Sequence, residues 1–455
     1  MQRKLLNELL NWKSSPKRKP LLLEGARQTG KTYLLETLFG KAYYDHVIRV
    51  NFEKADPELL NLFGGNIDTK RIINYLSIKE NKPVHQDNTL IIFDEIQEAP
   101  RALTSLKYFS EDAPEYQIAA TGSLLGIALH SGTSFPVGKV DRMRLYPMDL
   151  EEFYWALGLK KQSDEAQNAI RNMRNPLFSS SFADAFQQYL AIGGMPAAVS
   201  EWTEHRNMNH VDLILKNILS DFRDDFSKHT TNNESRKIAN LWRSVPNQFS
   251  KENHKFAYKT IESSARSRDY AFALDWLIDV GLIYKIDLVP HGDKLPLSFY
   301  ANSADFKIYT LDVGLLRRMT NLPISVVMGE DNIWSNFGGF FVEQFVVQQL
   351  RSLGFDETFY WMGNAGNSLQ PKGKSEVDFV VSFDNQIIPI EVKSGFNVKA
   401  QSLKVYRNKY HPELSIRFSL KNLKYNEGLL NIPLYYSFLL KDLINQKDKL
   451  NQLCM

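Results

Sequence analysis

The sequence predicts an α/β fold whose N-terminal third contains a parallel sheet. Three short apolar runs indicate strands of that sheet: Leu21–Leu23, Leu90–Phe93 and Gln117–Ala120. Apolar runs of this length, without polar alternation, are typical of strands covered by helices on both faces. Glycine, hydroxyl or carboxylate residues follow each run, as expected at the carboxyl ends of parallel strands, where open α/β sheets bind ligands.

The composition is that of a globular protein with several domains. Its 455 residues correspond to about three domains of ordinary size, 43% of them are hydrophobic, and the net charge is +3. This balance does not identify a partner class. The one cysteine, Cys454, excludes a disulfide framework and a cysteine-based zinc site, and the nine histidines form no pair with zinc-site spacing.

No membrane or export segment is legible in the sequence. No run reaches the roughly 18 apolar residues that a membrane span needs. Residues 1–20 are basic, but polar residues interrupt their leucines, so they lack the apolar core of a signal peptide. We therefore expect a cytoplasmic protein without a membrane partner.

The segment that follows the first strand matches the phosphate-binding loop G-x-x-x-x-G-K-[ST] at every position. Its glycines let backbone N–H groups turn around a β-phosphate, and the next helix directs its positive end at the same place. Lys31 is predicted to bind the β- and γ-phosphates, and Thr32 to bind Mg²⁺. The predicted ligands are ATP and Mg²⁺, and the predicted binding residues are Gly25, Ala26, Arg27, Gln28, Thr29, Gly30, Lys31 and Thr32.

Two carboxylates, Asp94 and Glu95, follow the strand Leu90–Phe93. In P-loop ATPases the first acid of such a pair holds the metal and the second polarises the attacking water. Asp94 is therefore a predicted metal ligand, and Glu95 a predicted catalytic residue. The strand Gln117–Ala120 ends with two hydroxyl residues, Thr121 and Ser123, on either side of a glycine.

These motifs resemble those of bacterial and archaeal AAA+-type ATPases that carry a C-terminal domain of unknown function. The resemblance spans nearly the whole chain and rests on Arg27, Asp94–Gln97, Ala120–Ser123 and Gly193–Pro196. It implies ATP hydrolysis, and it implies that Thr121 or Ser123 contacts the γ-phosphate or the attacking water. For Ser123, the N-cap of a following helix is the alternative role.

The arginine finger of that family has no clear counterpart. Where the family often has Gly-Arg before a Leu-x-Pro segment, this chain has Gly138-Lys139 before Leu145–Pro147. Arg142 and Arg144 are the nearby candidates, and ordinary surface arginines are the alternative for either one. We expect the ATPase core to cover residues 1–150.

Two further units are expected before the C-terminal domain. Residues 151–230 predict a helical lid, with helices at Phe182–Ile192 and Val211–Phe226. Residues 231–325 predict a winged-helix-like module in which Leu282–Ile286 and Leu297–Tyr300 form the wing hairpin. Because the second helix of this module is apolar and aromatic, intramolecular packing is favoured over reading of a DNA groove.

Residues 326–455 predict an α/β domain with a second chemical site. Glu343 lies on an apolar helix, Asp378 on a strand, and Glu391 and Lys393 on the next strand. This order of residues resembles that of restriction-endonuclease-like (PD-(D/E)xK) domains. Alternation along the strand places Glu391 and Lys393 on one face, where Glu391 and Asp378 can hold Mg²⁺ and the ammonium can activate water or neutralise a phosphate.

The Glu-x-Lys pattern alone is not specific, because Glu80–Lys82 has it by chance. The second occurrence differs because charges within apolar strands are costly unless they are paired or bind a ligand. A mutually satisfied cluster in a domain without catalysis is the alternative. Basic residues that surround this motif are Lys372, Lys374, Lys399, Lys404, Arg407 and Lys409. The predicted catalytic residues of the whole chain are Lys31, Asp94, Glu95, Thr121, Ser123, Glu343, Asp378, Glu391 and Lys393, and the predicted metal ligands are Thr32, Asp94, Asp378 and Glu391.

Two hypotheses for the whole chain follow. In the first, an ATPase controls a C-terminal nuclease-like domain that acts on nucleic acid, with DNA favoured over RNA. In the second, the chain is an ATP-driven switch or scaffold that acts on protein partners, and its C-terminal domain is inert. A simple P-loop kinase is less favoured, because Asp94 and Glu95 suit attack by water. The sequence leaves an oligomer open.

Overall fold

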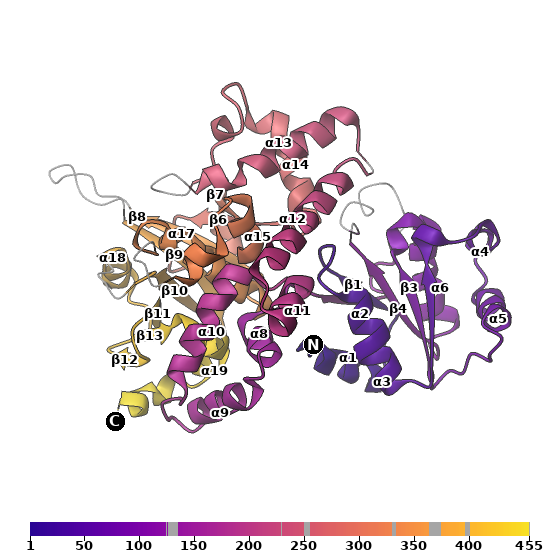
Figure 1. Ribbon diagram of the computed structural model, residues 1–455, viewed down its shortest axis with the longest axis horizontal. Helices are drawn as coiled ribbons and strands as arrows, with labels where there is room; N and C mark the ends of the chain where they lie inside the picture. The colour runs from indigo at the N-terminus through magenta and orange to yellow at the C-terminus, as the bar shows by residue number, and fades with distance from the viewer. Residues whose placement is uncertain are drawn as a thin grey trace. The chain divides into compact units, whose positions relative to one another are not determined.

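The computed structural model describes most of the chain, namely residues 1–123, 125, 135–228, 230–249, 255–329, 334–363, 375–395 and 401–454. It divides into two compact units (Figure 1). The N-terminal unit comprises Met1–Tyr146 with Leu274–Leu282, and the C-terminal unit comprises Pro147–Ala273 with Ile283–Met455. We describe each unit by itself.

The described strands of the N-terminal unit form one parallel sheet with the order β2-β3-β4-β1-β5. Their bounds are β1 Leu21–Glu24, β2 His46–Asn51, β3 Thr89–Asp94, β4 Gln117–Gly122 and β5 Asp141–Arg144. The α/β prediction and the predicted strands are therefore confirmed. Because β4 lies between β1 and β3, the end of β4 is adjacent to both the phosphate-loop strand and the strand that ends in Asp94.

Helices cover both faces of this sheet (Figure 1). Alternate residues of β3 divide between two apolar clusters: Ile91 and Phe93 pack on one face, Leu90 and Ile92 on the other. The helical segments are α1 Leu5–Ser14, α2 Lys31–Tyr33, a π-helix Leu34–Gly40, α3 Lys41–Tyr43, a 3-10 helix Phe52–Lys54, α4 Pro57–Leu62, α5 Thr69–Lys79, a 3-10 helix Ile96–Glu98 and α6 Pro100–Asp112. Burial on both faces explains why these strands are apolar throughout.

In the C-terminal unit, the described strands form one mixed sheet with the order β12-β13-β11-β10-β9-β8-β6-β7. Their bounds are β6 Ile283–Val289, β7 Asn302–Thr310, β8 Thr358–Gly363, β9 Ser375–Phe383, β10 Gln386–Val392, β11 Ser415–Ser419, β12 Lys424–Asn426 and β13 Leu429–Pro433. The sheet continues across residue 325, where the sequence predicts a domain boundary.

The predicted wing hairpin is wrong in its second strand. Leu297–Tyr300 forms a 3-10 helix, and β6 pairs instead with β7 in an antiparallel ladder. The reason is burial: only Leu297 of the short segment is buried, whereas β7 buries five consecutive residues from Phe306 to Thr310. The hairpin belongs to the edge of the large sheet.

The two helices predicted at Phe182–Ile192 and Val211–Phe226 correspond to α10 and α12. The chain breaks after α10 at Gly193, as predicted, but α11, which begins at Pro196, was not predicted. The helical segments of this unit are α8 Leu150–Ala156, α9 Lys160–Arg171, α10 Ser179–Ile192, α11 Pro196–His205, α12 Met208–Asp225, α13 Asn232–Gln248, α14 Ser267–Asp279 (divided between the two units), α15 Val313–Met319, α16 Ile324–Met328, α17 Trp334–Ser352, α18 Gln401–Tyr410, α19 Leu440–Asn445, and 3-10 helices at Tyr258–Thr260, Leu434–Leu439 and Lys447–Cys454. None of the helices within the described residues is long and apolar enough to cross a membrane.

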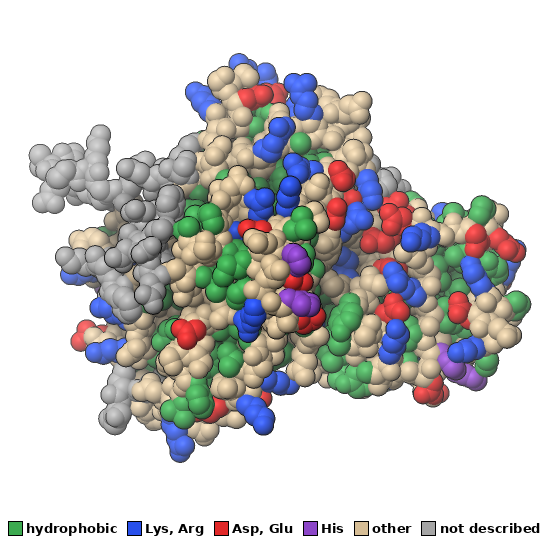
Figure 2. Space-filling model, viewed as in Figure 1, with side chains coloured by type: hydrophobic (Ala, Val, Ile, Leu, Met, Phe, Trp, Pro, Cys, Tyr) green, Lys and Arg blue, Asp and Glu red, His purple; other side chains and the backbone are tan. Residues whose placement is uncertain are grey.

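The face of the molecule shown in Figure 2 does not single out one partner class. On the face shown in Figure 2, Lys and Arg side chains alternate with Asp and Glu side chains and do not gather into one large patch of a single sign. This agrees with the net charge of +3. Any site for a charged ligand must therefore be found from local geometry.

Candidate functional sites

The phosphate loop connects the end of β1 to the start of α2. Its backbone has positive φ angles at Gly25 (146°), Gln28 (65°) and Gly30 (92°). A Cβ atom on Gly25 would lie 2.3 Å from the carbonyl oxygen of Leu145, so that position has room only for glycine. Thr29 closes the loop, because its Oγ1 donates to the carbonyl oxygen of Ala26 at 2.9 Å.

Lys31 is directed into the curve of this loop. Its Nζ donates to the carbonyl oxygens of Gly25 at 2.8 Å and Ala26 at 2.9 Å, and the side chain is buried. Burial lowers the pKa of Lys31 to about 8, although Glu95 and Asp94 oppose the shift. The ammonium of Lys31 is therefore desolvated and bonded only to neutral carbonyl oxygens. An anion such as a phosphate can replace these oxygens with a stronger, charge-assisted partner.

Asp94 lies at the centre of a network that joins three strands. Thr32 Oγ1 and Thr121 Oγ1 donate to its Oδ1 at 3.1 and 2.5 Å. Arg49 donates to its Oδ2 through Nε at 2.9 Å and Nη2 at 2.6 Å. The structure thus brings together Thr32, Asp94 and Thr121, three residues that the sequence predicts at one site.

Arg49 itself was missed by the sequence analysis. It lies on β2, and its Nη1 also lies 3.3 Å from Glu36 Oε2 on the π-helix behind the loop. The sequence signal for this contact was an arginine among the apolar residues of the predicted second strand. Arg49 lies two residues before Asn51, and Asn51 pairs with Asp94 in the β2–β3 ladder. Alternation along the strand places Arg49 on the same face as Asn51.

Glu95 has a left-handed backbone, with φ of 52°. Its Oε2 accepts hydrogen bonds from Gln97 Nε2 at 2.6 Å and Ser123 Oγ at 3.3 Å. A non-glycine residue in this conformation is held there by its surroundings. Thr121 therefore contacts the first carboxylate, and Ser123 contacts the second. The helix that Ser123 was alternatively expected to cap falls on residue 124 and residues 126–134, outside the described residues.

The two candidate finger arginines pair with a residue of their own unit. Arg142 Nε donates to Glu24 Oε1 at 2.8 Å, and Arg144 Nη2 lies 3.4 Å from Glu24 Oε2. Both arginines are about half exposed and lie on β5, beside the strand that enters the phosphate loop.

A second residue that the sequence analysis missed is Arg3. Its buried guanidinium donates to the carbonyl oxygen of Thr29 in the loop at 2.9 Å and to that of Tyr146 at 2.6 Å. Arg3 therefore ties the phosphate loop to the chain that follows β5. Its distance of 26 residues from Thr29 leaves no local sequence signal for this contact.

The second site lies where β9 and β10 separate. The ladder between them runs to the pair Phe379–Ile390, and beyond it the N–H of Val392 donates to Asp378 Oδ2 at 2.7 Å. Lys393 Nζ lies 2.6 Å from Glu391 Oε1. Burial, followed by the nearby Glu391 and Glu343, raises the pKa of Asp378 well above its usual value. The structure therefore places all four predicted residues of this domain in one electrostatic cluster.

Lys307 joins this cluster from β7 and was not predicted. The side chain is only 1% exposed, and its Nζ forms ion pairs with Glu376 and, at 3.9 Å, with Glu343. Burial alone would lower the pKa of Lys307, but Glu343, Glu376 and Asp378 raise it above its usual value. Tyr309 OH also donates to Glu343 Oε2, at 3.0 Å. A lysine within the apolar run of residues 306–309 was the available signal.

The predicted metal site of this domain rests on the two carboxylates Asp378 and Glu391. Within the part of the chain that the structure describes, no group of three or more His, Cys, Asp and Glu side chains is arranged to hold a metal ion. Of the basic residues predicted around the motif, Lys404, Arg407 and Lys409 lie on α18. The others, Lys372, Lys374 and Lys399, lie outside the described residues.

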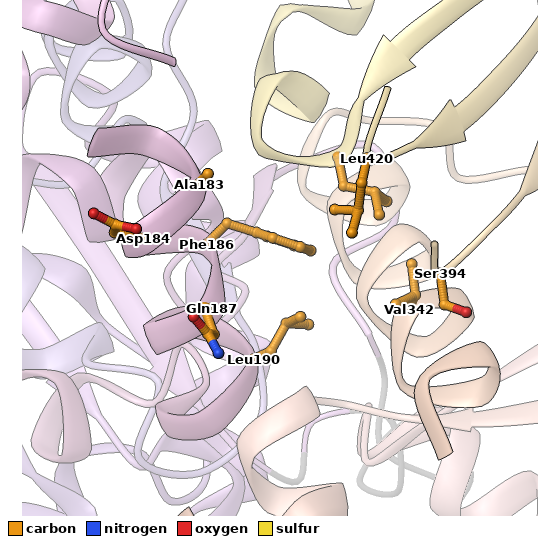
Figure 3. Close-up of a pocket in the computed structure, with 9 residues that line it drawn as sticks. Ala183, Asp184, Phe186, Gln187, Leu190, Val342, Ser394 and Leu420 are labelled. Carbon is orange, nitrogen blue, oxygen red and sulfur yellow. The ribbon is translucent and has the colours of Figure 1, made fainter. Parts of the chain in front are cut away.

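An apolar cavity of about 250 Å³ lies beside α10 in the C-terminal unit. Figure 3 shows Phe186 and Leu190 projecting from α10 toward Val342, Ser394 and Leu420. Val342 directly precedes Glu343, and Ser394 directly follows Lys393. The residues that line the cavity are mostly apolar, and two of them are sequence neighbours of cluster residues.

Comparison with protein-family models assigns residues 17–154 to an AAA domain. Two further models match residues 183–325 and 338–436, and both describe domains of unknown function (DUF8612 and DUF4143). A search of the curated proteins found no match.

Several solved structures are similar to this chain. The Walker-type ATPase of Pyrococcus abyssi has 14% identity, covers 70% of this chain and 95% of its own, and gives a TM-score of 0.44. PCH-2 of C. elegans has 14% identity, covers 49% of this chain and 69% of its own, and gives a TM-score of 0.28. The RuvB Holliday junction branch migration motor of Thermotoga maritima has 12% identity, covers 62% of this chain and 89% of its own, and gives a TM-score of 0.29.

The family match covers β1 to β5, the phosphate loop, and the residues that surround Asp94 and Glu95. Residues 17–154 therefore match an AAA domain and contain its phosphate-binding loop.

Proposed function

We propose that the chain hydrolyses ATP with Mg²⁺ and that its nucleotide state controls the C-terminal nuclease-like domain. The observation that carries the ATPase proposal is the convergence of Thr32 and Thr121 on Asp94, beside Glu95. A phosphate loop alone binds nucleotide. Two oriented carboxylates at the end of the neighbouring strand add the groups that hold a metal and activate water.

Each residue has a defined role in this proposal. Lys31 leaves the carbonyl oxygens of Gly25 and Ala26 and binds the β- and γ-phosphates. Thr32 and Asp94 would hold Mg²⁺, and the bound ion would supply positive charge beside the transferred phosphoryl group. Glu95 accepts a hydrogen bond from the attacking water, and its hydrogen bonds with Gln97 and Ser123 fix its orientation.

The proposal that nucleotide state controls a nuclease-like domain depends on the carboxylate cluster around Asp378 and Glu391. Asp378 and Glu391 supply the carboxylates for one Mg²⁺, and Lys393 supplies the ammonium that a water nucleophile or a phosphate oxygen needs. Glu343 is the helix acid that the resemblance implies. DNA is the favoured substrate class, as the sequence analysis proposes.

One observation favours the alternative, an inert domain within a switch that acts on protein partners. Asp378 Oδ2 already accepts a hydrogen bond from Val392, and Glu391 is already paired with Lys393. These two contacts partly compensate the cluster without a metal ion, although Glu391 Oε2 is buried and accepts no hydrogen bond from the described residues. The two functions differ in whether the cluster reacts with nucleic acid.

The ATPase part is tested by phosphate release from the Lys31→Ala variant. We expect at least about a tenfold loss of turnover, because charge-assisted hydrogen bonds to phosphate are worth about 1.5–3 kcal/mol each. Lys41→Ala, an exposed lysine just beyond the same helix, is the matched control and should keep full turnover. Unchanged turnover in Lys31→Ala would refute the assignment.

The nuclease part is tested with labelled single- and double-stranded DNA and RNA, Mg²⁺ or Mn²⁺, and with or without ATP. Cleavage by the full chain that is lost in Asp378→Ala supports the nuclease. The absence of cleavage in every combination supports the inert switch.

A further inference from the structure

A hollow of about 550 Å³ lies along α18 and the neighbouring strands of the C-terminal sheet. Its lining includes four basic side chains, Lys404, Arg407, His411 and Arg417, and one acidic side chain, Glu427. We call this hollow the α18 groove. Its excess of positive groups contrasts with the near-neutral balance of the whole chain.

Two of the arginines are held in place by contacts within the protein. Arg407 Nη2 donates to the backbone carbonyl of Glu427, in the turn between β12 and β13. Arg417 Nε donates to Asn431 Oδ1 at 2.9 Å. Such anchoring fixes the guanidinium groups before a ligand arrives, which lowers the entropy cost of binding.

The α18 groove is connected to the carboxylate cluster by strand register. Arg417 on β11 is the parallel partner of Glu391 on β10, and Asn431 on β13 is the partner of Arg417. Lys424 on β12 is in turn opposite Asn431. Paired residues of neighbouring strands face the same side of a sheet, about 5 Å apart. Glu391, Arg417, Asn431 and Lys424 therefore form a row across the sheet, and Arg417, the direct neighbour of Glu391 in this row, lines the groove.

The partial burial of Arg417 in the α18 groove favours the binding of an anion there. Arg417 is partly buried at the edge of the groove. A guanidinium withdrawn from water gains most from a second charge-assisted partner. The planar guanidinium matches a phosphate group with two parallel hydrogen bonds.

The cavity beside α10 differs from the α18 groove in the charge of its lining. Among the described residues that line the cavity beside α10, there is no lysine or arginine, and Asp184 is acidic. A polyanion has no counter-charge in that cavity. Of the two hollows, only the α18 groove offers cations next to Glu391.

We propose that the α18 groove binds the phosphodiester backbone of a nucleic acid and leads it to Asp378, Glu391 and Lys393. This inference rests on the proposed nucleic-acid function of the C-terminal domain and adds the surface that would recognise the substrate. Each backbone phosphate that a lysine or arginine neutralises releases counterions, so binding through the groove depends on salt.

The test is binding of a fluorescein-labelled oligonucleotide, single-stranded or duplex, to the full chain in EDTA. The double variant Lys404→Gln/Arg407→Gln should bind at least about tenfold more weakly. The slope of log affinity against log salt concentration should be smaller in magnitude by about 1–2, because each lost phosphate contact lowers this slope by about 0.7–0.9. The matched control, Lys216→Gln/Arg243→Gln, removes the same charge from exposed positions on α12 and α13 and should bind like the unmodified chain.

Three outcomes would overturn the proposal. The groove variant could bind as the unmodified chain does, the control could lose as much affinity as the groove variant, or the unmodified chain could fail to bind any oligonucleotide. Thermal melts of both variants show whether they are folded. If the groove variant unfolds, Lys404→Gln alone, at an exposed position, must reproduce the weaker binding, and the proposal fails if it does not.

Competition with other anions shows which class of anion the α18 groove binds. Inorganic phosphate or polyglutamate that displaces the oligonucleotide at equal concentration of anionic groups would show a small-anion site or an acidic-protein site, and would overturn the proposal. Because the experiment contains no metal ion and needs no turnover, it is independent of ATP hydrolysis and of cleavage. If the unmodified chain hydrolyses ATP but binds no oligonucleotide, this inference is refuted and the ATPase proposal stands.

Discussion

The guanidinium of Arg49 donates two hydrogen bonds to a single carboxylate oxygen of Asp94, at 2.6 and 2.9 Å. Thr32 and Thr121 donate to the other oxygen. Asp94 is only 2% exposed, so its charge is compensated inside the protein before any metal ion binds. In the proposed ATPase, Arg49 and Mg²⁺ therefore share one carboxylate.

Replacement of Arg49 by glutamine should raise the apparent affinity for Mg²⁺. The variant loses the positive charge that both repels the ion and neutralises Asp94. A change of about 1 kcal/mol corresponds to about a fivefold lower half-saturating concentration of Mg²⁺. The measurement is ATP turnover as a function of free Mg²⁺.

The Arg49→Gln variant should also be less stable without ligands, because a buried carboxylate loses its charged partner. Arg49→Lys keeps the charge and should lie between the variant and the unmodified chain. Identical Mg²⁺ dependence in all three proteins would show that Arg49 has no influence on the metal site.

Affinity for ATP should fall as the pH rises past about 8, the pKa of Lys31 in the free protein. The phosphates bind the ammonium form. Above this pKa the free protein holds the neutral amine, so binding must take up a proton, and affinity decreases about tenfold for each further pH unit. A fluorescent ATP analogue in EDTA measures this without a metal ion.

The control for the pH experiment is Lys31→Ala, whose weak affinity should not change over the same range. A flat profile for the unmodified chain from pH 7 to well above pH 8 would contradict the position of Lys31 inside the loop, desolvated and next to two carbonyl oxygens.

Replacement of Arg3 by glutamine should destabilise the N-terminal unit and weaken ATP binding. Two hydrogen bonds from a buried charged group are lost, at a cost of about 2 kcal/mol or more. The carbonyl of Thr29 is released at the same time, so the loop is held less firmly. Urea denaturation and ATP titration measure the two effects.

Arg18→Gln is the matched control for Arg3. Arg18 also donates to a backbone carbonyl, that of Glu115 at 3.0 Å, but at an exposed site away from the loop. Equal effects of the two substitutions on ATP binding would argue against a role of Arg3 in holding the loop.

Replacement of Lys307 by methionine should cost about 3–5 kcal/mol of unfolding free energy, because it leaves buried carboxylates without their counter-charge. Adding Glu376→Gln removes the nearest of these charges and should restore at least about 1 kcal/mol. Urea denaturation of the single and double variants gives both values. A double variant no more stable than the single variant would show that the pair does not interact.

The sequence was sufficient for features that depend on neighbouring residues. The loop from Gly25 to Thr32, the strand that ends in Asp94 and the helix break at Gly193–Pro196 follow from local conformational preferences and apolar patterns. The wing strand at Leu297–Tyr300 was predicted in the same way and was wrong, because the competing segment that ends at Thr310 buries more apolar surface.

The residues that sequence reasoning missed have partners far along the chain. Arg49 lies 45 residues from Asp94, and Arg3 lies 26 residues from Thr29. Lys307 lies 36 residues from Glu343. Their contacts depend on strand order and on the packing of helices against sheets, and no local pattern encodes these. The predicted domain boundary at residue 325 divides the eight-stranded sheet for the same reason: β6 and β7 pair with strands that come later in the chain.

The Glu95→Gln variant tests the central claim most directly. It keeps the shape of the side chain and its position beside Gln97 and Ser123, but it removes the carboxylate that activates water. ATP should bind with nearly unchanged affinity, while the rate of phosphate release falls at least about a hundredfold. Rapid phosphate release from this variant would contradict the account and place the water-activating group elsewhere.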